Sequence, residues 1–141
     1  MLMPTSSPRQ RLPLQVMTLD RQILTEIKVA DTWLSRLRGL LGSAALLPRQ
    51  GLLLSPCNSI HTAAMQYALD VVFLAQDGTI LKVVTQLPPW RGAVCWRARS
   101  TLELGAGTAA EVGLAIGQRL TVTPIPNWPG YVAICRTEGQ A

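Results

Sequence analysis

The stretch "ALDVVFLAQDGTILKVV", residues 68–84, carries the clearest local signal of secondary structure in this sequence. Two runs of apolar and β-branched residues flank "QDG", and both runs are typical of β-strands. Asp77 and Gly78 supply the positive φ angles that a tight hairpin turn requires. We therefore predict a β-hairpin here. Its second strand must end at "LPPW" (87–90), because neither proline can donate a hydrogen bond to a ladder.

Further strands are predicted on both sides of this hairpin. In "QILTEIKVA" (22–30), the odd-numbered residues alternate with polar side chains, which indicates a strand with one buried face. Another strand places Leu102 and Leu104 on one face and Glu103 on the other. Three more segments contain a strand-like run: "GLLLSP" (51–56), "GLAIGQRLTVTPI" (113–125) and, in the tail, "WPGYVAIC" (128–135).

Two short helices are predicted. In "DTWLSRLRGLLG" (31–42), apolar residues recur at helical spacing, Asp31 stands where an N-cap belongs, and Gly42 can end the helix. Thr108 and Glu111 match a capping box, so a second helix is expected to begin there. Together these elements predict an α+β fold: a β-rich single domain with a mostly antiparallel sheet or a small barrel, and two short helices.

Length and composition agree with one globular domain. The chain has 141 residues, of which 48% are hydrophobic and 15% charged. We expect a flexible leader at 1–21, the β-rich domain at 22–125, and a tail at 126–141 that adds one strand at most. No apolar run is long enough to span a membrane, and the leader lacks the apolar core of a signal peptide, so we expect a cytoplasmic protein.

The net charge of +5 and the pI near 9.7 favour anionic partners. No single basic run dominates, however. A soluble protein with scattered arginines is therefore the favoured interpretation over a nucleic-acid-binding protein.

The segment "PCNSIHTAAMQYALD" (56–70) contains residue types found in reactive centres. Cys57 and His61 are candidates for a nucleophile and its base, with Asp70 orienting the imidazole. One histidine and three widely spaced cysteines are a poor supply of zinc ligands, so we expect no metal. The favoured alternative is structural, with His61 hydrogen-bonded locally, Cys57 buried and Met65 filling the core.

The segment "GAGTAA" (105–110) fits the glycine pattern of a dinucleotide-binding turn. The helix that would follow is interrupted by Gly113 and Gly117, and no acidic residue follows at the spacing needed to bind a ribose. We interpret it as a turn into a short helix and expect no cofactor.

In "PPWRGAVCWRARS" (88–100), Trp90 and Trp96 interleave with three arginines. The arginines are Arg91, Arg97 and Arg99. Aromatic faces and guanidinium groups can together bind bases or anionic groups. If this segment is a strand, Trp96 points into the core while the arginines point into solvent, which divides the surface. The Pro-Pro loop can still present Trp90 to solvent.

The sequence resembles the family called domain of unknown function 192. The resemblance covers about residues 22–122 and rests on four segments in order: "RLRGLLG" (36–42), "GLLLSPCNSIHTAAMQYALDVVFLAQDGTILKVV" (51–84), "LPPWR" (87–91) and "TLELGAGTAAEVGLAIGQRL" (101–120). It implies a compact, mostly antiparallel β fold without an established activity. Family members often show an aromatic "FWMKNT" where this chain has "SIHTAAM", so a function tied to the aromatic motif does not carry over.

In this alignment Asp70 falls on the family's "LD" step, inside an otherwise apolar strand. A buried carboxylate requires donors, and we hypothesise an arginine partner. The candidate partners are Arg36, Arg38, Arg91 and Thr62.

We expect a small binding or accessory domain with a shallow pocket near this segment, and with a small molecule or a protein as its partner. The predicted binding residues are Cys57, His61, Thr62, Met65, Asp70, Trp90 and Arg91. Two alternatives stay open: a hydrolase or transferase that uses Cys57 and His61, and an anion or nucleic-acid binder that uses the Arg/Trp surface at 90–99.

Overall fold

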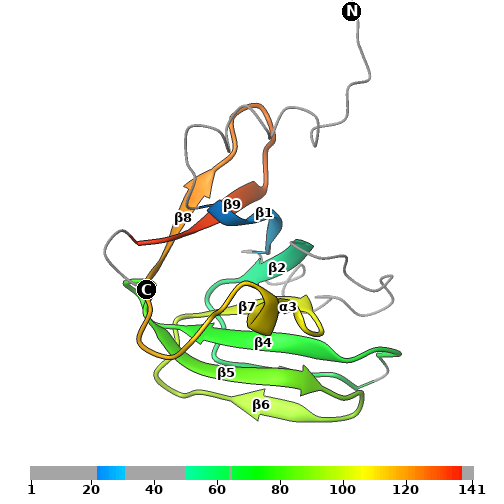
Figure 1. Ribbon diagram of the computed structural model, residues 1–141. Helices are drawn as coiled ribbons and strands as arrows, with labels where there is room; N and C mark the ends of the chain where they lie inside the picture. Colours follow the sequence, from blue (N-terminus) through cyan, green and yellow to red (C-terminus); the bar gives the residue numbers. More distant parts are fainter. Residues whose placement is uncertain (1–21, 31–49, 64, 138–141) are drawn as a thin grey trace, which may run out of the picture.

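The computed structural model describes residues 22–30, 50–63 and 65–137. Within these ranges the chain forms strands and one short helix (Figure 1). The strands are β1 (Gln22–Ala30), β2 (Gln50–Leu54), β3 (Ser59–His61), β4 (Leu69–Leu74), β5 (Ile80–Leu87), β6 (Gly92–Val94), β7 (Ser100–Gly105), β8 (Leu120–Pro124) and β9 (Tyr131–Arg136), and the helix is α3 (Thr108–Glu111). The helix predicted at 31–42, its cap Asp31, and the leader lie outside the described residues.

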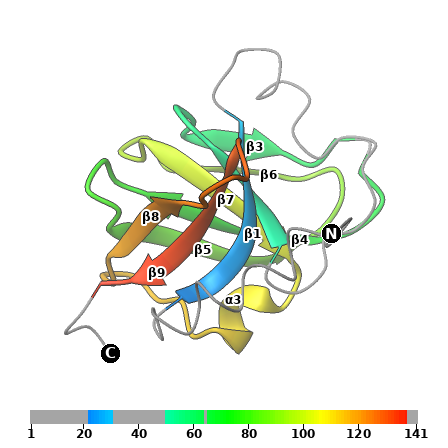
Figure 2. The same ribbon diagram turned by 90° about the horizontal axis from the view of Figure 1, so that it is seen from above.

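Seven strands form one mixed sheet in the order β5-β4-β7-β2-β1-β9-β8 (Figures 1 and 2). Only β1 and β2 pair in parallel, so the predicted β-rich, mostly antiparallel architecture is confirmed. The strand predicted in the tail is β9, which lies between β1 and β8 inside the sheet.

The alternative of a small barrel is wrong, because the sheet does not close. The two edge strands, β5 and β8, meet at one corner only. There a bridge joins Thr79 to Arg119, and the Leu120 N–H donates to the Gly78 carbonyl at 2.9 Å. Backbone donors alternate along a strand, so Pro124 falls on the same open edge of β8, where it has no N–H to offer a continuing ladder.

The predicted hairpin is confirmed as β4 and β5. Of the two residues predicted to have a positive φ, only Gly78 has one, at 90°, and the prediction is wrong for Asp77. The Asp77 carboxylate accepts from the Thr79 N–H at 3.0 Å. Gly78 is required for a second reason: a Cβ at this position would collide with the Leu120 carbonyl. β5 ends at Leu87, directly before the two prolines, as expected.

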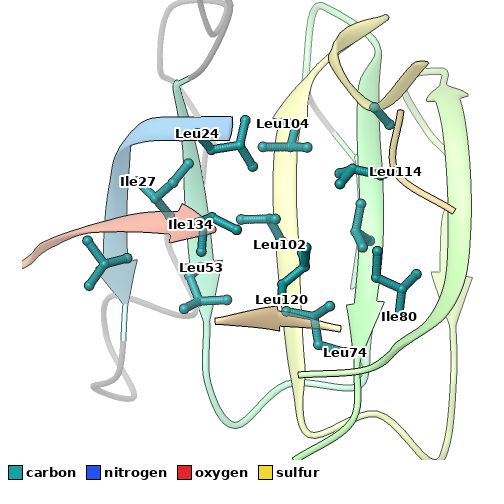
Figure 3. Close-up of a cluster of buried hydrophobic side chains, with 13 residues drawn as sticks. Leu24, Ile27, Leu53, Leu74, Ile80, Leu102, Leu104, Leu114, Leu120 and Ile134 are labelled. Carbon is teal, nitrogen blue, oxygen red and sulfur yellow. The ribbon is translucent and has the colours of Figure 1, made fainter. Parts of the chain in front are cut away.

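The interior core lies on the face of the sheet that receives side chains from all seven strands (Figure 3). Its members are Leu24, Ile27, Leu53, Val72, Leu74, Ile80, Leu102, Leu104, Ala109, Leu114, Leu120, Val132 and Ile134. The alternation predicted for β1 is corrected here, because Leu24 and Ile27 both point inward. Irregular register between β1 and β9 around Leu24 moves an even-numbered and an odd-numbered residue onto one face.

A second core occupies the opposite face. Its buried members are Leu52, Leu54, Met65, Leu69, Val71, Phe73 and Leu87. The two-stranded sheet of β3 and β6 covers part of it, since Ile60 and Ala93 pack against this cluster. The outer side of this small sheet carries exposed residues, including Ser59 and His61.

The capping box predicted at Thr108 and Glu111 is wrong, although the helix itself is present. Gly107 occupies the N-cap position with a φ of 92°, and no side chain of the helix start caps it. Thr108 is instead the first helical residue and is buried. The acceptor that a capping side chain would supply comes from Asp70, which is distant in sequence.

Candidate functional site

The pairing of β3 with β6 joins two candidate segments that the sequence analysis treated separately. Ser59 lies opposite Val94, and His61 lies opposite Gly92. The cysteine–histidine segment and the Trp/Arg segment therefore lie side by side. β6 is also fastened to the main sheet, because the Lys82 ammonium on β5 donates to the Val94 carbonyl at 3.0 Å.

Thr62 is the residue that organises these two segments, and its side chain is fully buried. Its hydroxyl donates to the Pro88 carbonyl at 2.6 Å and accepts from the Arg91 N–H at 2.9 Å. The hydroxyl thus stands between the first and fourth residues of the turn at 88–91, where a direct backbone hydrogen bond often lies. The Thr62 backbone adds two bonds, from its N–H to the Arg91 carbonyl and from the Trp90 N–H to its carbonyl.

Trp90 is the third residue of this turn and has a φ of +64°. That conformation normally belongs to glycine, and a residue with a bulky side chain held there is strained by about 1–3 kcal/mol. The indole is nevertheless 67% exposed, so burial of the ring does not offset the strain. The expected open presentation of Trp90 is found, and the buried hydroxyl of Thr62 maintains it.

Trp96 is also exposed, which corrects the interpretation that it packs in the core. β6 ends at Val94, and the Ala98 N–H donates to the Cys95 carbonyl at 2.9 Å, which makes 95–98 a turn. Trp96 and Arg97 occupy the two central positions of that turn, and the Trp96 ring is 78% exposed. The predicted division of tryptophan and arginine onto opposite faces of a strand therefore does not arise.

We define the β3–β6 surface by its exposed side chains. They are His61, Trp90, Arg91, Trp96, Arg97 and Arg99. The sequence between Asp77 and Glu103 contains no acidic residue, and Glu103 itself is buried. The segment that carries most of this surface thus adds positive charge without an exposed carboxylate among its own residues.

Asp70 does not pair with an arginine among the described residues, so the hypothesised Asp70–Arg91 pair is wrong. The carboxylate is fully buried and accepts from two backbone N–H groups, those of Gln86 and Ala109, both at 2.8 Å. These two donors supply what a buried carboxylate needs, and Arg91 stays exposed. Of the other candidate partners, Thr62 bonds the 88–91 turn, while Arg36 and Arg38 lie outside the described residues.

Cys57, His61 and Asp70 do not converge. Cys57 packs against the second core, while Asp70 contacts α3, whose Ala109 belongs to the interior core on the opposite face. His61 points into solvent, and the Cys57 thiol donates to the Ser59 carbonyl at 3.1 Å. The arrangement of nucleophile, base and orienting acid is therefore not assembled. Met65 fills the second core, as in the structural alternative.

Glu103 is a chemically distinctive residue that the sequence analysis assigned only to the face opposite Leu102. It is 5% exposed on β7, between Leu52 of β2 and Val71 of β4. Burial raises the pKa of its carboxyl to about 7. Burial and the nearby Glu103 carboxylate also raise the pKa of Tyr67. Strand alternation alone could not reveal this site, because it does not tell which strands have both faces covered.

In the ranges 22–30, 50–63 and 65–137, no group of three or more His, Cys, Asp or Glu side chains is placed to hold a metal ion. No helix in the described part of the chain combines the length and the hydropathy of a membrane span.

Comparisons with known proteins agree with this fold. The model of the DUF192 family, described as "Uncharacterized ACR", matches residues 15–122. A crystal structure of a protein of unknown function from Novosphingobium aromaticivorans is similar with a TM-score of 0.61 and 19% identity, over 66% of this chain and 71% of that one. A Sinorhizobium meliloti protein described as a "putative transcription regulator" gives 0.59 and 27%, over 66% and 78%. No curated protein matches the sequence.

Proposed function

This chain belongs to the DUF192 family, and we propose that it is a non-enzymatic binding domain that recognises an anionic ligand through the β3–β6 surface. The observation that carries the proposal is the state of Trp90. The backbone of Trp90 is strained while its indole is exposed. Hydrogen bonds from the turn at 88–91 to the buried hydroxyl and the backbone of Thr62 hold this conformation. Backbone strain that the surrounding structure maintains tends to mark a functional site, and packing gives no other reason for this one.

Charge indicates the class of ligand. Arg91, Arg97 and Arg99 are all exposed, and no acidic residue occurs in the sequence between Asp77 and Glu103. Guanidinium groups bind phosphate, sulfate and carboxylate groups in bidentate geometry, and a surface of one sign speeds the approach of an oppositely charged ligand. The Sinorhizobium meliloti protein, with its description as a transcription regulator, supports a polyanion over a small anion.

The shallow pocket predicted near residues 56–70 is replaced in this proposal by an open surface. Thr62 builds the surface from beneath, and Met65 fills the core that the β3–β6 sheet covers, while Asp70 stabilises the interior of the fold. His61, Trp90 and Arg91 are the predicted residues that we place in contact with the ligand. A cytoplasmic location stays a prediction from the sequence.

Retention on immobilised heparin tests this proposal. The double variant Arg91→Ala/Arg97→Ala should elute at a clearly lower salt concentration than the original chain, because each lost phosphate or sulfate contact weakens salt-dependent binding. A variant that pairs Lys28→Gln with Arg119→Gln serves as the control for net charge, since it removes two exposed cations that lie outside the β3–β6 surface. An equal shift in both variants means that retention follows net charge alone, and the β3–β6 surface would then lose its role.

A further inference from the structure

We propose that the ligand of the β3–β6 surface is a single-stranded nucleic acid whose bases stack on Trp90 and Trp96 while the neighbouring arginines contact its phosphates. This inference rests on the proposed function, because it names the class of anion that the surface binds. Its first support is the exposure of the two rings, 67% and 78%. Tryptophan is usually among the more buried residues, so two open indoles in one short segment call for a partner with planar faces.

The spacing of the two rings suits a strand of several nucleotides. Trp90 precedes β6 by two residues and Trp96 follows it by two. Six extended residues span at most about 20 Å at 3.3 Å per residue. Stacked bases of one strand rise about 3.4 Å each, so roughly six nucleotides cover that distance. Proteins that bind single strands through aromatic platforms have sites of about 4–16 nucleotides.

The platform is preformed, which lowers the entropy lost on binding. β6 is held by its ladder to β3, by Lys82, and by the bond from the Cys95 N–H to the Asn58 carbonyl at 2.9 Å. The Trp90 turn is held by Thr62, and the Trp96 turn is closed by its own backbone bond. Both rings therefore project from fixed backbones and do not have to be ordered by the ligand.

The exposed rings favour a single strand over a duplex. In a duplex the base faces stack on one another, and only base edges are accessible in the grooves. A duplex held by its phosphates would contact the arginines, and the indoles would have no base face to stack on. Acidic peptides would be bound through the arginines alone. A sulfated sugar can pack a ring face on an indole, so it is separated from a single strand by whether the tryptophan variants weaken binding of an oligonucleotide.

The test measures binding of a fluorescein-labelled ten-residue oligothymidylate to the full chain by fluorescence anisotropy. Trp90→Ala and Trp96→Ala should each weaken binding about 5- to 100-fold, the range that stacking on one aromatic ring accounts for. Ile116→Ala is the matched control, since Ile116 is 68% exposed, apolar and outside the surface. Its affinity should equal that of the original chain. Arg91→Ala should lower the slope of log K against log salt by about 0.7.

The possible results distinguish the proposed anion-binding function from binding of a single strand. Weakening by both tryptophan variants with an unchanged Ile116→Ala supports the inference. If heparin is retained through the arginines while the tryptophan variants bind the oligonucleotide normally, the proposed function stands and the inference fails. Binding to a duplex as tightly as to the single strand, without an effect of the tryptophans, also overturns it. If neither heparin nor oligonucleotide binds, both proposals fail.

Discussion

Two buried polar side chains, Asp70 and Thr62, have comparable positions with different consequences. Each is fully buried. Asp70 hydrogen-bonds Gln86 near the end of β5, and Thr62 hydrogen-bonds the turn at 88–91 that follows β5. Asp70 accepts from the N–H of Gln86, which has a φ of 53°, and Thr62 closes the turn that contains Trp90, at 64°. Two of the three non-glycine residues with positive φ in the described chain are therefore held by a buried side chain.

The difference lies in what each anchor presents. Asp70 also accepts from Ala109, so it joins the end of β5 to α3 and stabilises the interior of the fold. Thr62 joins β3 to a turn whose most prominent side chain points into solvent. In both places a buried polar side chain hydrogen-bonds backbone groups. At Asp70 these bonds stabilise the interior of the fold, and at Thr62 they hold the turn that exposes Trp90. A stability measurement separates these roles if it is paired with a binding measurement.

Replacing Asp70 by Ala should have the largest effect on stability. It removes two charge-assisted hydrogen bonds and leaves the buried Ala109 N–H and the part-buried Gln86 N–H without this acceptor, a loss of roughly 3–5 kcal/mol. Urea denaturation followed by circular dichroism measures it. Asp70→Asn, which keeps the size of the side chain, should be destabilised less than Asp70→Ala. An unchanged free energy of unfolding in Asp70→Ala would show that Asp70 does not stabilise the fold through these two bonds.

Glu103, the other buried carboxylate, differs from Asp70 in that burial raises its pKa. The pKa lies near 7 in the folded chain and near 4.5 in the unfolded chain. The folded state therefore keeps a proton that the unfolded state releases, and the free energy of unfolding should fall as pH rises from about 4.5 to 7. The total fall attributable to Glu103 is on the order of 3 kcal/mol.

Glu103→Gln should abolish that fall, so the variant should exceed the original chain in stability at pH 8 by on the order of 3 kcal/mol. Urea melts at pH 5 and pH 8 give the comparison. If the two proteins show the same dependence on pH, Glu103 is ionised in the fold and its environment is more polar than its burial indicates.

Thr62→Val should have an intermediate effect, about 1–3 kcal/mol, because the Arg91 N–H and the Pro88 carbonyl lose a neutral partner. Valine keeps the shape of the side chain, and Thr62→Ser keeps the hydroxyl and serves as the control. The affinity for heparin should fall in Thr62→Val even under conditions where the protein is fully folded. Unaltered affinity would mean that the conformation of the Trp90 turn does not depend on Thr62.

Trp90→Gly should have the smallest effect on stability and the opposite sign. Glycine adopts a φ of +64° without strain, and its extra freedom in the unfolded chain offsets part of the gain, so we expect a change of about 0–1 kcal/mol in favour of folding. Binding of the oligothymidylate should nevertheless weaken about as much as in Trp90→Ala. A clear destabilisation in thermal melts would show that the indole contributes to packing, and Trp90 would then belong with Asp70 as a structural residue.

Local patterns predicted the fold well where the signal was local. The Asp77-Gly78 turn, the end of β5 at its prolines and the faces of β7 follow from neighbouring residues. The pairing of β3 with β6 does not, because three-residue strands carry no periodicity. The alternation of β1 failed for another reason: irregular pairing with β9 depends on a strand far away in the sequence.

The site was harder to predict from the sequence, because it also depends on contacts between residues that are distant in the sequence. Asp70 was correctly expected to need donors, but the donors are backbone groups at Gln86 and Ala109, and backbone groups have no signature in a sequence. The sequence predicts Trp96 in a strand with its ring in the core. The turn that follows Val94 instead exposes the ring to solvent. The buried state of Glu103 depends on what covers the second core, which alternation within one strand does not report.

The position of β1 has a consequence for how the chain reaches this structure. β1 lies between β2 and β9, so the first described strand is bonded to the last, with Gln22 opposite Cys135. Bringing together chain segments so distant costs more loop-closure entropy than forming the β4–β5 hairpin. We expect that hairpin and its pairing with β7 to form early. We expect the pairing of β1 with β9 to form later and to complete the sheet.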